Sequence, residues 1–370
     1  NMVTLPFNRI QTKILGSVAG LISLFSCTGD KTQQNDVPSQ PNILFISVDD
    51  LRPALGCYGN KDVKSPNFDK LASSSTTFNR AYCQAPVCMP SRTSLMSGIH
   101  PENYKNNGSL SAEPLDTLLP GVLSLADYFK KNNYKTISIG KTYHHNFDDK
   151  DGWSKRYTET FTEEKYGAQG YASGYQNPEY QKLVYNYIHA WSNPALMDSA
   201  RPPATEMAQA PDSAYPDGKI TNLVLDELKN LKNSKTPFFI AAGFYRPHLP
   251  FTPPKRYWDM YKPADIDLAD NPYMPEYGIS FTDWNELRRY GDILQKGDLS
   301  HKKARQLIHG YYASVSFIDA QIGKIMQGLE KFGMDQNTII IVWGDHGWNL
   351  GEHGMWCKHT NYEISTRTAM

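Results

Sequence analysis

Four apolar runs of strand length, each followed closely by ionisable side chains, constrain the fold of this chain more than any other feature. The runs cover residues 43–48, 136–139, 237–244 and 338–343. The residues that follow them are Asp49 and Asp50, Lys141, Arg246 and His248, and Asp345 and His346. Strands that are apolar throughout are typical of a parallel sheet buried on both faces, and such sheets carry sites beyond the carboxyl ends of their strands. The sequence therefore predicts an α/β fold with ionisable groups gathered at one edge.

Helical segments are expected between these strands, because parallel strands need crossover connections. Apolar residues recur at helical spacing over 123–134 and over 311–332, where the pattern stops at Gly333. Residues from about 150 to 215 are rich in Tyr, Asn, Gln, Pro and Ser and show little periodicity. We interpret this stretch as a loop-rich insertion that overhangs the predicted site.

The N-terminal residues have the pattern of an export signal. Arg9 and Lys13 precede an apolar run, 14–25, that is too short to span a bilayer comfortably. The sequence Leu-Phe-Ser-Cys that ends at Cys27 resembles a bacterial lipoprotein box, so segment 1–27 predicts a lipid anchor at that cysteine. Residues 28–40 are polar and suit a flexible tether. We expect a location in the bacterial cell envelope, in the periplasm or on the outer membrane; an ordinary secretory signal is the alternative.

Charge and cysteine content narrow the possible partners. Lys and Arg together number 38, as do Asp and Glu, so no net positive charge favours nucleic acid as a partner. With Cys27 and Cys88 set aside, Cys57, Cys83 and Cys357 remain, and one pair of these could form a disulfide. No C-x-x-C spacing suggests zinc.

The pentapeptide C-M-P-S-R at 88–92 is the most specific motif. It resembles the C-x-P-S-R signature of the type I, formylglycine-dependent sulfatases. In that family the cysteine is oxidised to formylglycine (3-oxoalanine), and the hydrated aldehyde attacks sulfur. A geminal diol can expel sulfate by returning to the aldehyde, which a serine ester could not do. The alternative is a buried cysteine ahead of a turn.

A sulfate ester also calls for a cation, since it resists an anionic nucleophile. A hard divalent ion can lower the pKa of the nucleophile and neutralise sulfate oxygens. Asp49, Asp50, Asp345 and His346 are the candidate ligands, together with the nucleophile made from Cys88, and we expect one calcium ion.

The chain from residue 41 onwards resembles the sulfatase branch of the alkaline-phosphatase-like superfamily, and within it the iduronate-2-sulfatases and related uronate 2-O-sulfatases. Segments 41–53, 140–144, 243–251 and 343–358 carry the resemblance, and the Asp345-His346 pair replaces the Asp-Asn of many other sulfatases. The resemblance implies a central, mostly parallel sheet flanked by helices in a catalytic domain over 41–370. Family members continue into a C-terminal subdomain, which we expect to be missing here.

The resemblance also implies residue roles and partners. Arg92 and Lys141 would hold the hydrated aldehyde, and Lys141 and Lys358 would bind sulfate oxygens. Asp345 could receive the attacking proton, His248 would protonate the leaving sugar oxygen, and His144, rather than His145, would be the base. The implied substrate is the 2-O-sulfate of a uronic acid in a glycosaminoglycan-type oligosaccharide. A formylglycine-generating enzyme is the implied partner.

Two other functions compete with this interpretation. A phosphatase or phosphodiesterase of the same superfamily would share the metal site, but it would lack C-x-P-S-R and need further metal ligands. A non-catalytic, glycan-binding lipoprotein could keep the fold without the chemistry. Intact Cys88, Arg92, Lys141, His248 and Lys358 favour the enzyme.

Overall fold

The computed structural model describes residues 40–104, 114–144, 148–149, 151–157, 173–190, 199–277 and 286–370. The predicted signal segment with Cys27, residues 28–39 of the predicted tether, and His145 lie outside these ranges. Export and the lipid anchor therefore stay predictions. Within the described ranges, no helix combines the length and the apolar character of a membrane span.

A five-stranded parallel sheet forms the centre of the fold, in the order β4-β3-β5-β1-β6. A separate antiparallel pair joins β2 to β7. The strands are β1 (Asn42–Val48), β2 (Ala81–Tyr82), β3 (Lys135–Gly140), β4 (Lys155–Arg156), β5 (Phe238–Phe244), β6 (Thr338–Gly344) and β7 (Arg367–Thr368). The four apolar runs are β1, β3, β5 and β6, which confirms the predicted parallel sheet.

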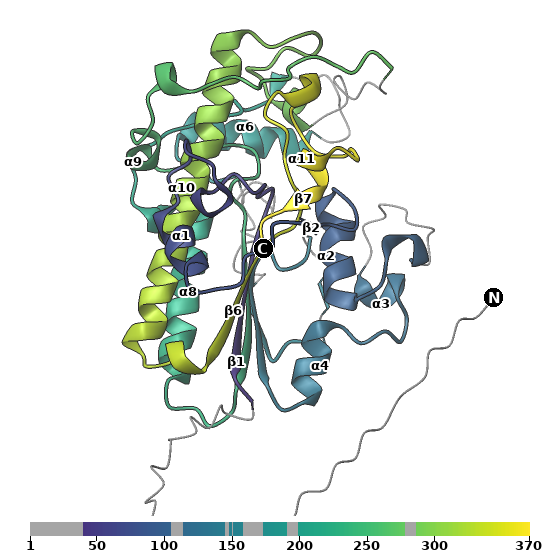
Figure 1. The fold of residues 1–370 in the computed structure, drawn as a ribbon, viewed down its shortest axis with the longest axis vertical. Helices are drawn as coiled ribbons and strands as arrows, with labels where there is room; N and C mark the ends of the chain where they lie inside the picture. Colours follow the sequence, from purple (N-terminus) through teal and green to yellow (C-terminus); the bar gives the residue numbers. More distant parts are fainter. Residues whose placement is uncertain are drawn as a thin grey trace, which may run out of the picture. The chain divides into compact units, whose positions relative to one another are not determined.

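Helices cover both faces of the sheet. The helices are α1 (Pro66–Ala72), α2 (Cys88–Ser97), α3 (Leu115–Leu118), α4 (Leu125–Lys131), α6 (Pro178–His189), α8 (Pro216–Leu231), α9 (Lys255–Trp258), α10 (His301–Lys331) and α11 (Glu363–Thr366). Short 3₁₀ turns are η1 (Gly56–Tyr58), η2 (Pro101–Asn103), η4 (Asp212–Ala214), η5 (Pro263–Asp265), η6 (Glu286–Arg289), η7 (Asp335–Asn337) and η8 (Glu352–Gly354). Figure 1 shows α1, α8 and α10 on one side of the sheet and α2, α3 and α4 on the other.

Alternation along the strands explains these layers. In β1, Leu44, Ile46 and Val48 pack into the core with α8 and α10, whereas Ile43 and Phe45 pack into a second core with α2, α3 and α4. Successive side chains of a strand point to opposite faces, so an uninterrupted apolar run supplies both cores. This accounts for the absence of an apolar–polar alternation in the sequence of β1.

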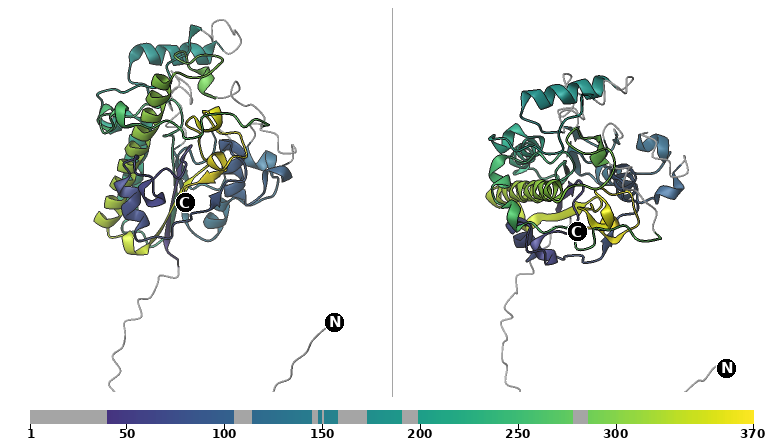
Figure 2. Two further views of the ribbon diagram at one scale, coloured as in Figure 1. Left: turned by 45° about the horizontal axis from the view of Figure 1, so that its top comes forward. Right: turned by 90° about the horizontal axis from the view of Figure 1, so that it is seen from above.

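Two helical segments differ in extent from the sequence-based expectation, and one was not predicted. Helix α10 begins at His301, ahead of the predicted start, because its first turns carry few apolar residues, and α4 is shorter than 123–134. The stretch 150–215, for which the sequence predicts a loop-rich insertion, contains the 12-residue helix α6 in its described part. Figures 1 and 2 place α6 beyond the carboxyl ends of the strands.

Backbone hydrogen bonds continue past the strand ends and hold the site residues side by side. The amide of Asp49 donates to Phe244 O over 3.2 Å, that of Lys141 to Gly243 O over 2.8 Å, and that of Asp345 to Val48 O over 3.2 Å. Three residues that are far apart in the sequence are thereby fixed at one edge of the sheet.

Gly243 tests this arrangement, because a Cβ atom there would clash with the backbone of Lys141. We expect Gly243→Ala to lower the free energy of unfolding by about 2 kcal/mol or more, since overpacking a backbone contact forces β3 and β5 apart. Urea unfolding of the variant and the parent chain measures this difference. An unchanged midpoint would contradict the close packing of these two strands.

Candidate active site

The motif at 88–92 forms the first turns of α2, and its spacing directs two side chains to one place. Cys88 begins the helix, and Arg92 follows four residues later on the same face. Both side chains are buried, as is Ser91, whose hydroxyl donates to Asp345 O over 2.5 Å. The local helix therefore presents Cys88 and Arg92 together to the strand ends.

Four potential metal ligands meet beside Cys88. Ligand atoms of Asp49, Asp50, Cys88 and His346 all lie within 4.8 Å of one another, and all four residues are buried. The Cys88 Sγ is 3.2 Å from Nε2 of His346. Nδ1 of His346 lies 2.9 Å from Gly347 O, which can only accept, so Nδ1 carries the proton and Nε2 presents a lone pair to the cluster.

Asp345, the fifth residue in the predicted metal set, borders this cluster. One of its carboxylate oxygens accepts from the amide of Asp50 over 2.9 Å, and the other accepts from Nε of Arg92 over 2.9 Å. The first oxygen is also 3.6 Å from Nε2 of His346. Asp50 itself has a φ of 59°. Such a left-handed residue is uncommon without glycine and is held here by surrounding contacts.

Buried cations accompany the carboxylates. Lys141 pairs with Asp49, while Nζ of Lys358 is 2.8 Å from Oδ1 of Asp50. Lys358 also lies 5.1 Å from the centre of the Trp348 ring. Both ammonium groups therefore lie among the candidate metal ligands, where a bound anion could also reach them.

Burial and neighbouring charge shift the pKa values of these acids in opposite directions. Burial opposes ionisation of Asp49, but the charges of Lys141 and Arg92 outweigh it and hold its pKa well below the usual range. Burial raises the pKa of Asp50 well above its usual value despite Lys358. Burial, reinforced by the charge of Asp49, raises the pKa of Asp345 to about 7. The lysine and arginine side chains of the site therefore keep only some of its carboxylates ionised.

Sequence reasoning missed Glu286, which reaches the site from η6. Its carboxylate is 3.0 Å from Nζ of Lys358, 3.5 Å from Nε2 of His248 and 3.7 Å from Nε2 of His359. Burial opposes ionisation of Glu286, but Lys358 outweighs it and the pKa is well below normal. No strand end or known motif marks this residue, so only the three-dimensional contacts identify it.

A cavity of about 300 Å³ opens over these groups. Its wall includes Asp49, Lys141, His144, His248 and Glu286, so both predicted acid–base histidines share one pocket. Helix α6 contributes Val184, Tyr187 and Ile188. The described part of the stretch 150–215 thus forms part of the cavity wall, whereas the full extent of the predicted insertion stays a prediction.

The remaining cysteines form no disulfide within the described ranges. Cys57, Cys83 and Cys357 are free thiols, as is Cys88. Burial raises the pKa of Cys88 well above 9, so its unmodified thiol is protonated near neutral pH and is a poor nucleophile.

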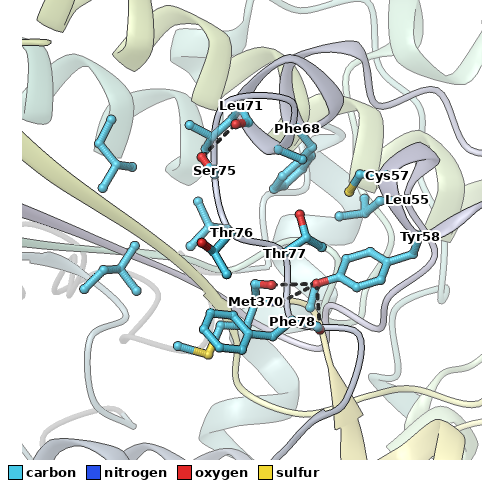
Figure 3. A pocket seen from close by; sticks show the side chains of 15 residues that line it. Leu55, Cys57, Tyr58, Phe68, Leu71, Ser75, Thr76, Thr77, Phe78 and Met370 are labelled. Carbon is cyan, nitrogen blue, oxygen red and sulfur yellow. Dashed lines mark hydrogen bonds between the residues drawn. The ribbon is translucent and has the colours of Figure 1, made fainter. Parts of the chain in front are cut away.

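A second cavity, of about 240 Å³, lies beside β6 and Met370 and is lined mainly by apolar groups (Figure 3). There the hydroxyl of Tyr58 donates to Met370 O over 2.8 Å, and Ser75 donates to Leu71 O over 2.7 Å. Among the described residues, those that line it include no Asp, Glu, His, Lys or Arg. It is therefore not a candidate for acid–base or metal chemistry.

The sulfatase family model matches residues 41–370, which cover the whole sheet and every residue of the cavity. The chain belongs to the sulfatase family. Its relatives include the iduronate 2-sulfatases of Mus musculus, 33% identical over 91% of this chain, and of Homo sapiens, 31% identical over 95%. This chain spans 60% and 62% of the lengths of those two proteins.

The solved structures agree on the fold. The phosphonate monoester hydrolase of Agrobacterium radiobacter superimposes with a TM-score of 0.64 at 20% identity, covering 89% of this chain and 67% of that one. At this identity the likeness concerns the fold alone. The predicted alkaline-phosphatase-like architecture is thereby confirmed.

His248 predicts a pH dependence of stability. Burial, followed by the charge of Lys358, lowers its pKa to about 3 in the folded chain, whereas an unfolded histidine titrates near about 6.5. Between these values the unfolded state binds a proton that the folded state does not, so this group destabilises the fold as the pH falls. Without metal, the free energy of unfolding should therefore fall less in the His248→Gln variant than in the parent chain when the pH is lowered from about 7 to about 4.

Urea midpoints at both pH values measure this difference. His301→Gln, which changes an exposed histidine at the start of α10, is the matched control and should follow the parent. Equal losses in the His248 variant and the parent would contradict a half-buried, neutral His248.

Proposed function

We propose that this sulfatase-family protein hydrolyses sulfate esters with a formylglycine nucleophile made from Cys88 and one calcium ion beside it. The observation that carries the proposal is the position of the Cys88 Sγ, 3.2 Å from Nε2 of His346 within the buried group that includes Asp49 and Asp50. The motif at 88–92, which predicts oxidation of Cys88, thus lies next to the side chains that could bind a divalent cation.

The residues present suit a divalent cation. In the described part of the protein, Oδ2 of Asp50 is buried without a hydrogen-bond partner, and carboxylate oxygens are the ligands that calcium prefers. The raised pKa values of Asp50 and Asp345 indicate a local deficit of positive charge. Asp49, Asp50, Asp345 and His346 would hold the ion. When bound, calcium would favour the ionised nucleophile and neutralise sulfate oxygens.

The other cationic groups are placed to orient the reacting groups. Arg92 is held by Asp345 and by Asp49, whose carboxylate is 3.4 Å away, so its guanidinium is fixed beside Cys88. Lys141 and Lys358 face the carboxylates of Asp49 and Asp50. Calcium would compete for these carboxylates and leave both ammonium groups available for charge-assisted bonds to sulfate.

Two histidines of the cavity wall can move protons. Nδ1 of His248 lies 2.6 Å from Leu249 O, which fixes the ring and leaves Nε2 to donate to the departing sugar oxygen. The low pKa of His248 in the chain alone would rise when an anionic sulfate lies beside it. His144 lines the same cavity and would accept the proton released when the nucleophile is regenerated.

The proposed substrate is the 2-O-sulfate of a uronic acid in a glycosaminoglycan-type oligosaccharide. Similarity to two iduronate 2-sulfatases over most of this chain supports this choice. The cavity volume of about 300 Å³ lies at the small end of ligand pockets, which suits a single sugar ring at the reacting position.

Mass spectrometry of the tryptic peptide 81–92 is the direct test. Protein made in a host with a formylglycine-generating enzyme should carry an aldehyde in place of the Cys88 thiol, while Cys83 in the same peptide stays unmodified. The matured protein should release sulfate from a 2-O-sulfated uronate, and Cys88→Ala should lower this rate about a thousandfold or more.

An unmodified Cys88 in such a host would contradict the proposal. Phosphate mono- and diesters, assayed with the same preparation, separate sulfatase from phosphatase activity. Faster hydrolysis of these esters than of any sulfate ester would favour the phosphatase alternative.

Calcium removal provides a second test. Calcium at 100 times its Kd should stabilise the protein by about 2.7 kcal/mol, and a chelator should remove both this gain and sulfate release. Asp50→Asn should lose the calcium-dependent stabilisation, because it removes one ligand charge, whereas Asp226→Asn, at an exposed position of α8, should keep it. Thermal unfolding with and without calcium measures the effect, and equal stability under both conditions would contradict the assigned ion.

A further inference from the structure

The short helix η6 directs two opposite charges toward the cavity. Side chains three residues apart in a 3₁₀ helix lie on the same face. Glu286 and Arg289, the first and last residues of η6, both line the cavity. Leu287 and Arg288 between them are buried and do not line this cavity.

Among the residues that the structure describes, partners are found for only one of these two charges. Glu286 contacts Lys358, His248 and His359, as described above. Arg289 is exposed, and within the described ranges we find no ion pair or hydrogen bond from its guanidinium. Arg289 is therefore a cation on the pocket wall whose charge the described residues leave available.

The backbone under Arg289 is nevertheless anchored. The guanidinium of Arg288 donates to Leu294 O and to Gly297 O, each over 2.6 Å, and Leu287 lies in the main hydrophobic core. A recognition group on a fixed support loses less entropy on binding than one on a loose loop. This anchoring makes the position of Arg289 suitable for ligand recognition.

Arg289 also lies close to Glu286, which contacts Lys358 of the proposed sulfate site. Three residues of a 3₁₀ helix rise about 6 Å, so the backbone of Arg289 is about that far along the helix axis from the backbone of Glu286. Glu286 contacts Lys358 beside the proposed sulfate position. Tyr187 and Ile188 of α6 line the same cavity. A sugar ring there would have its sulfate near Lys358 and another substituent near Arg289.

We propose that Arg289 binds a second anionic group, a carboxylate or a sulfate, on the same sugar whose sulfate ester is cleaved. A guanidinium can pair with either group through two parallel N–H donors. Arg289 would thus make the pocket selective for sugars that carry two negative groups. This inference rests on the proposed sulfatase function and adds a residue that determines its specificity.

Binding to the inactive Cys88→Ser protein, loaded with calcium, tests the inference without turnover. The ligands are a 2-O-sulfated uronate monosaccharide, its carboxyl-reduced analogue, and a neutral sugar with two sulfates. Adding Arg289→Ala should weaken binding of the uronate about tenfold, which is the usual effect of losing a hydrogen bond to a charged group, and should leave the reduced analogue unchanged. Arg289→Lys should lose less. Arg80→Ala, which removes an exposed charge outside the cavity, is the control.

The ligands distinguish the two anions. Loss of affinity for the uronate alone identifies a carboxylate as the partner, and loss for the disulfated neutral sugar alone identifies a sulfate. The inference would be overturned if Arg289→Ala left the affinity for every ligand unchanged. It would also be overturned if the substitution weakened binding of the carboxyl-reduced analogue as much as binding of the uronate. The proposed function is judged separately, by sulfate release from a neutral aryl sulfate by the matured parent protein.

Discussion

The buried guanidinium of Arg92 joins α2 to three strand ends, and the geometry of the site depends on it. It donates to Asp345 after β6, to Asp49 after β1, to Ser47 Oγ within β1, and to the carbonyls of Lys141 and Thr142 after β3. A buried charge is tolerated only when its donors are satisfied, and removing Arg92 would leave the carboxylate of Asp345 without its cationic partner. Arg92 is therefore as much a part of the fold as of the site.

The hydrogen bonds of Arg92 depend on the parallel pairing of β3, β5, β1 and β6. Because neighbouring strands run in the same direction, all their carboxyl ends lie at one edge, and the bonds from Asp49, Lys141 and Asp345 extend the ladder by one residue. Helix α2 lies against this edge and brings Cys88 within reach of His346. The sheet thus converts four distant segments into one compact set of ligands.

The charge balance at this edge links structure to chemistry. Arg92, Lys141 and Lys358 are three cations beside four carboxylates, those of Asp49, Asp50, Asp345 and Glu286, and burial keeps the pKa of Asp50 raised. A divalent cation would complete the balance and free the lysines for an anionic substrate. In η6, Glu286 pairs with Lys358, whereas Arg289 lines the cavity without an ion pair to any residue that the structure describes.

The sequence by itself determined the parallel sheet, the family and the placement of Asp49, Lys141, His248 and Asp345 at strand ends, because apolar runs and the motif at 88–92 are local patterns. It did not reveal that the stretch 150–215 contains the helix α6, and it did not reveal Glu286 or Arg289 as residues of the pocket. These residues belong to segments without a strand pattern or a known motif, and their role depends on contacts across long sequence separations. The alternative disulfides among Cys57, Cys83 and Cys357 were likewise decided by position, because the folded chain leaves all three thiols unpaired. Local patterns state where the chain forms strands and turns, whereas only tertiary packing decides which distant side chains share one cavity.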